Sequence, residues 1–208
     1  MKSVQGRVVV VLAAVLVLGC LGRSAAVRFY TMSPVEGRAL DSIAEDLIVV
    51  VGPVSFPRYL ERPHLVTRAV ASELKIDEFR RWAGGFESNV RRVLVDNLRA
   101  RLGQQRVATV PLVHPSGPVF RVMLDILQFE GDPGNDLILR VHWIAWDEAK
   151  RTRAWSEEVT IRRPLKAKDV ASLVATHDQA LGQLSDVIAA RIASLNDAKT
   201  EAAPVGGT

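Results

Sequence analysis

Residues 119–146 read VFRVMLDILQFEGDPGNDLILRVHWIAW, and this stretch decides the fold. Apolar and polar residues alternate up to Phe129, which is typical of a β-strand with one buried face. The run at 131–136 is dense in turn-forming residues and leads into a second apolar segment, 137–146, so the sequence predicts a β-hairpin. Alternation returns at 155–161 and predicts a third strand.

Two segments have the residue spacing of amphipathic helices. The first begins near Ser88 and ends before Gly103, a residue typical of helix C-caps, and its apolar stripe contains Val90, Val93, Leu94, Leu98 and Leu102. The second follows Asp169, a candidate N-cap, and its apolar stripe contains Val170, Leu173, Val174, His177, Leu181, Leu184, Ile188, Ile192 and Leu195.

The N-terminal half of the chain adds shorter strands. They are expected at 27–32, 47–51, 65–70 and 73–76. The second of these should stop at Gly52-Pro53, and a proline-bounded loop at 57–63 separates it from a short hairpin formed by the last two. The predicted class is α+β, an antiparallel β-sheet with two helices packed on one face.

Composition narrows the classes of protein to consider. The chain has 208 residues, of which 48% are apolar and 24% charged, as expected for one globular domain. The formal net charge is only +4, and two of the cations, Lys2 and Arg7, precede Cys20, so no nucleic-acid partner is expected. Cys20 is the only cysteine, which excludes an intramolecular disulfide and a metal site built on paired thiolates.

The N-terminus has the features of an export signal. Lys2 and Arg7 precede an uninterrupted apolar run at 8–18, which is too short to span a bilayer but has the length of a signal-peptide core. The run ends in Val-Leu-Gly-Cys at 17–20, which resembles a bacterial lipobox. Residues 1–19 are therefore expected to be a lipoprotein signal peptide, with Cys20 as the lipidated residue.

The sequence also suggests where the anchored protein resides. Leu21 stands where an aspartate would signal retention at the inner membrane, so we expect a lipid anchor at the periplasmic face of the outer membrane of a Gram-negative envelope. Residues 20–28 would form a lipidated tether, 29–196 the folded domain and 197–208 a disordered tail. Two alternatives remain open: an uncleaved membrane anchor, and a secreted protein cleaved near 24–26.

No catalytic constellation is evident. His64, His114, His142 and His177 lack the spacing of a zinc site, and His177 falls on an apolar helix stripe, as a core histidine would. The nucleophile-elbow, P-loop and dinucleotide motifs are absent. Adjacent Glu157 and Glu158 would point to opposite faces of a strand. We expect no catalytic residues, no cofactor and no metal.

Two segments resemble a known family. Residues 51–63 read VGPVSFPRYLERP and continue into LVTR at 65–68, and residues 79–83 read FRRWA. Together with the lipobox and a Tyr30-x-x-x-Pro34 pattern, they are similar to the ABC-type transport auxiliary lipoproteins, the paraquat-inducible protein C-like family, over residues 20–195. The chain departs from the family pattern at 84–86, where Gly-Gly-Phe replaces an acidic residue, proline and leucine.

The resemblance implies a non-enzymatic partner of MCE-type ABC lipid transporters, tethered to the outer membrane, with a homo-oligomer suited to a conduit. Two readings apply to the motif residues: structural support of the fold, or a docking surface for the MCE protein or lipid phosphate, to which arginine binds in a bidentate fashion. The candidate docking residues are Arg58, Tyr59, Arg62, Arg68, Arg80, Arg81 and Trp82.

Two other functional classes remain open. One is a structural outer-membrane lipoprotein that assists assembly of another envelope complex. The other is a periplasmic enzyme whose pocket, lined by Trp143 or Trp146, has no sequence signature.

Overall fold

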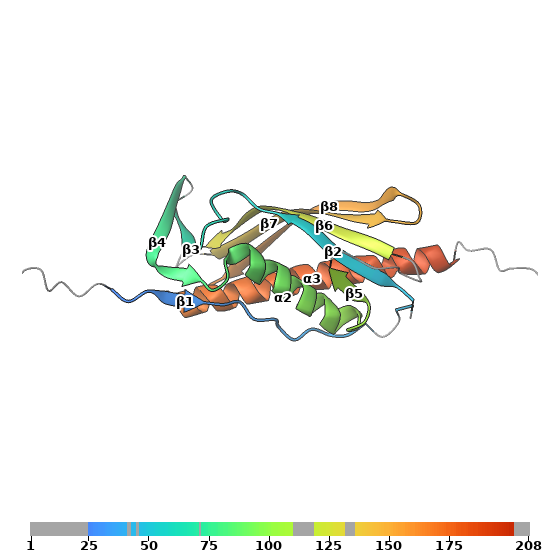
Figure 1. The fold of residues 1–208 in the computed structure, drawn as a ribbon, viewed down its shortest axis with the longest axis horizontal. Coiled ribbons are helices and arrows are strands. Elements are labelled where there is room, and N and C mark those ends of the chain that lie inside the picture. The colour runs from blue at the N-terminus through green and yellow to red at the C-terminus, as the bar shows by residue number, and fades with distance from the viewer. Residues whose placement is uncertain are drawn as a thin grey trace, which may run out of the picture.

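The computed structural model describes residues 25–40, 43–44, 46–70, 72–109, 119–131 and 136–201. In this part of the chain, two helices lie on one face of a five-stranded sheet, and a three-stranded sheet stands at one end of the molecule (Figure 1). The α+β class with two helices on one face is therefore confirmed. Cys20 and the expected signal peptide lie outside the described residues.

The large sheet has the strand order β5-β2-β6-β7-β8. Its strands are β2 (Ile48–Ser55), β5 (Val107–Thr109), β6 (Val119–Gly131), β7 (Asp136–Asp147) and β8 (Thr152–Pro164). The predicted hairpin is confirmed, because β6 and β7 pair antiparallel from Phe120↔Asp147 to Gly131↔Leu137. The register shifts between Ile126 and Gln128, so β6 bulges at Leu127.

β2 differs from the sequence-based expectation in two ways. It runs through Gly52 and Pro53 to Ser55, with a register shift between Val51 and Val54. It also pairs parallel with both β5 and β6, so the sheet is mixed and only its β6–β7–β8 part is antiparallel. Parallel pairing needs a long crossover, and the hairpin at 64–82 together with the first helix supplies it between β2 and β5.

The small sheet has the order β1-β4-β3. Its strands are β1 (Arg28–Tyr30), β3 (His64–Val70) and β4 (Glu73–Trp82). The expected hairpin forms, but β4 is longer than predicted and continues through the FRRWA segment to pair parallel with β1. The N-terminal strand thereby ties the start of the domain to the family-like motif.

The helices are α2 (Phe86–Leu102) and α3 (Val170–Glu201). Both predicted end signals are confirmed: Gly103 has φ 108° and its N–H donates to Arg99 O at 2.9 Å, and Ser172 N–H donates to Asp169 Oδ1 at 2.7 Å. α3 continues to Glu201, into the segment 197–208 where we expected the disordered tail. Among the described residues, no helix has the length and apolar character that crossing a membrane requires.

The core fills the space between the helices and the large sheet. Phe120, Val122, Leu124 and Ile126 of β6 are buried, as their alternation predicted. Trp143 is fully buried on β7, so it belongs to this core.

Candidate docking site

The seven candidate residues lie at the small-sheet end of the molecule but in different surroundings. Arg58, Arg62 and Arg80 are exposed, Arg81 and Tyr59 are half-buried, and Trp82 is only 3% exposed. Trp82 therefore belongs to the core and cannot contact a partner from its buried position. The structure separates the set into a surface group and a supporting group.

Tyr59 and Arg68 bind a buried carboxylate that the sequence did not single out. The side chain of Glu130 is fully buried, and its Oε1 accepts from Arg68 Nε at 2.7 Å and lies 2.6 Å from the second guanidinium nitrogen. Its Oε2 accepts from the Tyr59 hydroxyl at 2.7 Å and from Phe129 N–H at 3.1 Å. Both carboxylate oxygens are thus occupied, as a buried charge requires.

This cluster joins three parts of the fold. Tyr59 comes from the loop at 56–63, Arg68 from β3 and Glu130 from β6. Adjacent residues on a strand face opposite sides of a sheet. Because Phe129 packs against α3, Glu130 points away from the helices, where the loop and β3 cover it.

The pKa values of the two partners show how closely they are coupled to the carboxylate. Burial raises the pKa of Tyr59, and the hydrogen bond to Glu130 and its charge act in the same direction. Burial opposes the charged form of Arg68, but the hydrogen bond and charge of Glu130 outweigh it, so the pKa of Arg68 is raised. Both groups therefore keep their protons.

Trp82 lies in an aromatic cluster that closes the core beneath the small sheet. Its ring centroid is 5.5 Å from Phe86 and 5.4 Å from His177, and His177 is 4.8 Å from Phe129. Burial lowers the pKa of His177 to about 4, although hydrogen bonding to the backbone and the charge of Glu130 act in the opposite direction. The imidazole is therefore neutral at pH 7, consistent with the core position that the helix stripe predicted.

Arg58 and Arg62 are the exposed cations of a well-fixed loop. Leu60, between them, is buried and its N–H donates to Pro57 O at 2.8 Å, while Trp82 N–H donates to Pro63 O at 2.7 Å. Within the described residues, neither arginine side chain forms an ion pair or hydrogen bond. They are thus free to bind an anionic partner.

On β4, Arg80 is engaged in an ion pair and Arg81 is half-buried, so both are less accessible than Arg58 and Arg62. Arg80 donates to Asp77 Oδ2 at 2.8 Å. Arg81 has a buried Nε without a hydrogen-bond partner among the described residues. The geometry therefore favours Arg58 and Arg62 as the more available cations.

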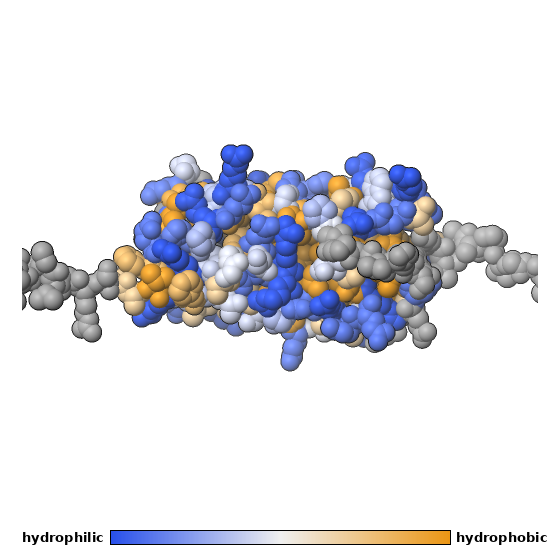
Figure 2. Space-filling model, in the orientation of Figure 1, coloured by the Kyte–Doolittle hydropathy of each residue, from blue (hydrophilic) through white to orange (hydrophobic). Residues whose placement is uncertain are grey.

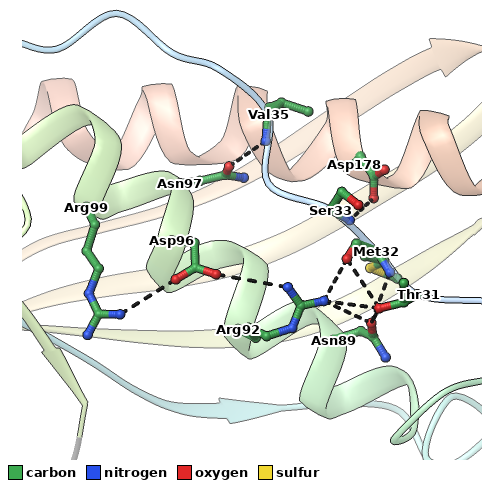
Figure 3. Close-up of polar contacts among 10 residues, drawn as sticks. All are labelled: Thr31, Met32, Ser33, Val35, Asn89, Arg92, Asp96, Asn97, Arg99 and Asp178. Carbon is green, nitrogen blue, oxygen red and sulfur yellow. Dashed lines mark hydrogen bonds and ion pairs between the residues drawn. The ribbon is translucent and has the colours of Figure 1, made fainter.

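Sequence reasoning missed a strap of chain, residues 31–40, that runs along both helices, and Figure 3 shows its contacts at residues 31–35. Asn89 Oδ1 accepts from Met32 N–H at 3.0 Å, and Asn97 Oδ1 accepts from Val35 N–H at 2.9 Å. Arg92 donates to Met32 O at 2.6 Å. Polar side chains of α2 thus form the hydrogen bonds that a neighbouring strand would otherwise form with this backbone. Two asparagines beside the apolar stripe of α2 were the available sequence signal.

The strap also contacts α3. Ser33 N–H donates to Asp178 Oδ1 at 3.0 Å, and burial raises the pKa of Asp178 to about 6 although Ser33 and Arg92 favour its charged form. Farther along the strap, Leu40 N–H donates to Arg101 O of α2 at 2.9 Å, and the buried Arg101 side chain pairs with Asp186 of α3 at 2.5 Å. The chain that follows β1 is therefore fastened to both helices.

A groove of about 330 Å³ lies between α2 and strands β2 and β5 of the large sheet. Its polar lining includes Arg91, Arg92, Arg99 and Asp96, and Asp96 lies 3.6 Å from Arg99 and 4.0 Å from Arg92. The carboxylate thus offsets part of the positive charge. In the described part of the chain, no three His, Cys, Asp or Glu residues are grouped as a metal site would require.

Comparisons with known structures agree with this fold. A crystal structure of a Xanthomonas campestris protein described as DUF330 is 16% identical, with a TM-score of 0.69, covering 84% of this chain and 99% of that one. A crystal structure of an uncharacterized protein is also 16% identical, with a TM-score of 0.65, covering 81% and 99%. At such low identity the likeness concerns the fold alone. No curated protein sequence matches significantly.

The family resemblance seen in the motifs is confirmed over most of the domain. The family model described as the ABC-type transport auxiliary lipoprotein component matches residues 30–189, which include the 56–63 loop, the Glu130 cluster and most of α3. The chain therefore belongs to the ABC-type transport auxiliary lipoprotein family.

Proposed function

We propose that this protein is a non-enzymatic, lipid-anchored periplasmic component of an MCE-type ABC lipid transport system, and that it couples the transporter to the outer membrane. The family match over residues 30–189 carries this proposal. The lipobox ending at Cys20 supports the anchor, and Leu21 after it supports the outer membrane. Several acyl chains hold a protein stably, because each buried methylene contributes about 0.8 kcal/mol.

In this role, the loop at 56–63 is the docking element. Arg58 and Arg62 are exposed, while Leu60 between them is buried and the neighbouring Tyr59 is bonded to Glu130. A loop fixed in this way loses little conformational freedom when a partner binds, which favours affinity. The Glu130 cluster and Trp82 then act as the support for the docking surface.

The test is affinity purification of the full-length, lipidated protein from detergent-solubilised envelopes, with bound proteins identified by mass spectrometry. We expect an MCE-domain protein and its permease to copurify. Recovery of outer-membrane assembly proteins instead would favour the structural lipoprotein, and recovery of neither group would contradict the proposal.

Charge reversal identifies the docking surface. Arg62→Glu should abolish copurification while leaving the melting temperature unchanged, because its side chain is exposed. The matched control is Arg162→Glu, an exposed arginine on β8 at the other sheet edge, which should still copurify the partner. Equal loss in both variants would indicate a nonspecific effect of net charge.

A further inference from the structure

Large apolar side chains that are exposed gather on the small sheet. They are Val27 at 42% exposed, Phe29 at 66%, Val70 at 58%, Ile76 at 37% and Phe79 at 48%. All five lie in β1, β3 or β4 or directly before β1. Within the described residues, the large sheet and both helices have no exposed side chain of this kind.

The pairing of β1 with β4 shows which side of the small sheet the exposed apolar residues of β1 face. Tyr30 pairs with Trp82, which is buried and faces the core. Phe29, one residue earlier, pairs with Arg81 and therefore points to the opposite, outer side. A phenylalanine held two-thirds exposed on a paired strand has no folding role that accounts for its exposure.

The surface lies where the chain enters the fold. Phe79 lines a depression of about 360 Å³ together with Ala25 and Ala26, the first described residues, and with Arg28, Asp77 and Arg80. Figure 1 shows β1 and the β3–β4 hairpin at the same end of the molecule, and Figure 2 shows apolar surface gathered where the N-terminal chain joins the fold.

The tether is short enough to hold this surface at the membrane. Cys20 is five residues before Ala25. An extended chain spans at most about 3.6 Å per residue, so the lipidated residue would lie within about 18 Å of Ala25. That distance is smaller than the roughly 30 Å hydrocarbon thickness of a bilayer.

We propose that the apolar surface formed by Val27, Phe29 and Phe79 is a second membrane contact, which inserts into the interface of the bilayer that holds the acyl anchor. This proposal rests on the lipid anchoring proposed above. Apart from Arg68, whose charge is paired with Glu130, residues 25–30 and 56–82 carry six Arg or Lys against four Asp or Glu, a balance that suits a surface of anionic lipid phosphates. The acyl chains supply the attachment, and the small sheet fixes the orientation of the domain.

The experiment uses the full lipidated protein reconstituted into phosphatidylglycerol vesicles. A single cysteine, Phe79→Cys, carries an environment-sensitive fluorophore, and brominated lipids serve as quencher. The matched control is Thr160→Cys, an exposed position on β8 in the large sheet. We expect a blue shift and strong quenching for the label at 79 and neither change at 160, with weaker effects in phosphatidylcholine vesicles.

The outcomes separate this inference from the anchoring proposal. If the protein does not sediment with vesicles, the anchor has failed. If it sediments but the label at 79 behaves as the label at 160 does, the second contact is refuted. A blue shift in detergent alone that depends on protein concentration would assign the surface to a second copy of the chain and overturn the proposal. Phe29→Ser should reduce quenching at 79 without changing sedimentation.

Discussion

Replacing Arg68 with methionine removes the cation that faces buried Glu130, and the structure sets the expected cost. The shortest approach of the two charges is 2.6 Å, and the carboxylate side chain is fully buried. At an effective dielectric constant of about 20, the gross attraction at this distance is roughly 6 kcal/mol. Removing one partner of a buried pair typically costs about 3–5 kcal/mol.

The cost for Arg68→Met should fall at the lower end of that range. Tyr59 and the Phe129 N–H still bind the carboxylate after the substitution, and the Arg68 side chain is itself 27% exposed. We expect a loss of about 3 kcal/mol, which in a domain of this size lowers the melting temperature by roughly 6–12 °C. Urea denaturation followed by near-UV circular dichroism measures the free energy of unfolding.

A double-mutant cycle tests the reasoning. In the Glu130→Gln background there is no buried charge to leave unpaired, so Arg68→Met should then cost less than about 1 kcal/mol. Arg80→Met is the matched control, because its partner Asp77 sits in an exposed pair worth less than about 1 kcal/mol. Equal costs of Arg68→Met in the two backgrounds would refute the buried ion pair as the source of stability.

Three further predictions concern the core and the strap. The pKa of His177 is about 4 in the folded protein against an ordinary 6.5, so the stability it contributes is complete above pH 6.5 and is lost as the pH falls through 4. That loss is about 3 kcal/mol, and His177→Phe should flatten the dependence of the melting temperature on pH in this window. The stability that depends on Asp178 changes with pH in the opposite direction. The pKa of Asp178 is raised from 3.8 to about 6, so its contribution to stability is present below pH 3.8 and is lost as the pH rises through 6. Asp178→Asn keeps an oxygen for Ser33 N–H and should raise the melting temperature at pH 7 but not at pH 3.5; no gain at pH 7 would contradict the burial of the charge. Asn89→Ala leaves the Met32 N–H without its acceptor and the Ala83 and Gly85 carbonyls without their side-chain donor, which should cost about 1–3 kcal/mol and expose the strap to limited proteolysis; unchanged proteolysis would contradict this role of Asn89.

The sequence predicted the elements whose signals are local. Alternation along β6, the apolar run of β7 and the turn-forming residues between them specified the hairpin, and the apolar stripes and end residues specified α2 and α3. The bulge at Leu127 could not be read from the same pattern, because it comes from the pairing with β7. The bulge shifts the alternation, so that Phe129 faces α3 and Glu130 faces the loop at 56–63.

The Glu130 cluster could not be predicted from the sequence for a different reason. Tyr59 and Glu130 are 71 residues apart, and Arg68 and Glu130 are 62 apart. A single glutamate at the end of an apolar strand gives no local sign that it will be buried by residues so distant. The motif resemblance marked Tyr59 and Arg68 as unusual, and only the fold distinguishes their supporting role from that of exposed Arg58 and Arg62.

The two proposed surfaces meet at Arg80, and this overlap gives a last prediction. Arg80 lines the depression beside Phe79 and also belongs to the candidate docking set, whereas Arg62 lies on the 56–63 loop. If the small sheet contacts lipid and the loop contacts the MCE protein, Arg80→Glu should weaken quenching at position 79 by adding an anion next to lipid phosphates. Arg62→Glu should leave quenching unchanged and remove the partner from the purified complex. Both proteins should melt as the parent does, because both side chains are substantially exposed. Loss of the partner in both variants with unchanged quenching would assign Arg80 to docking and contradict its place at the membrane.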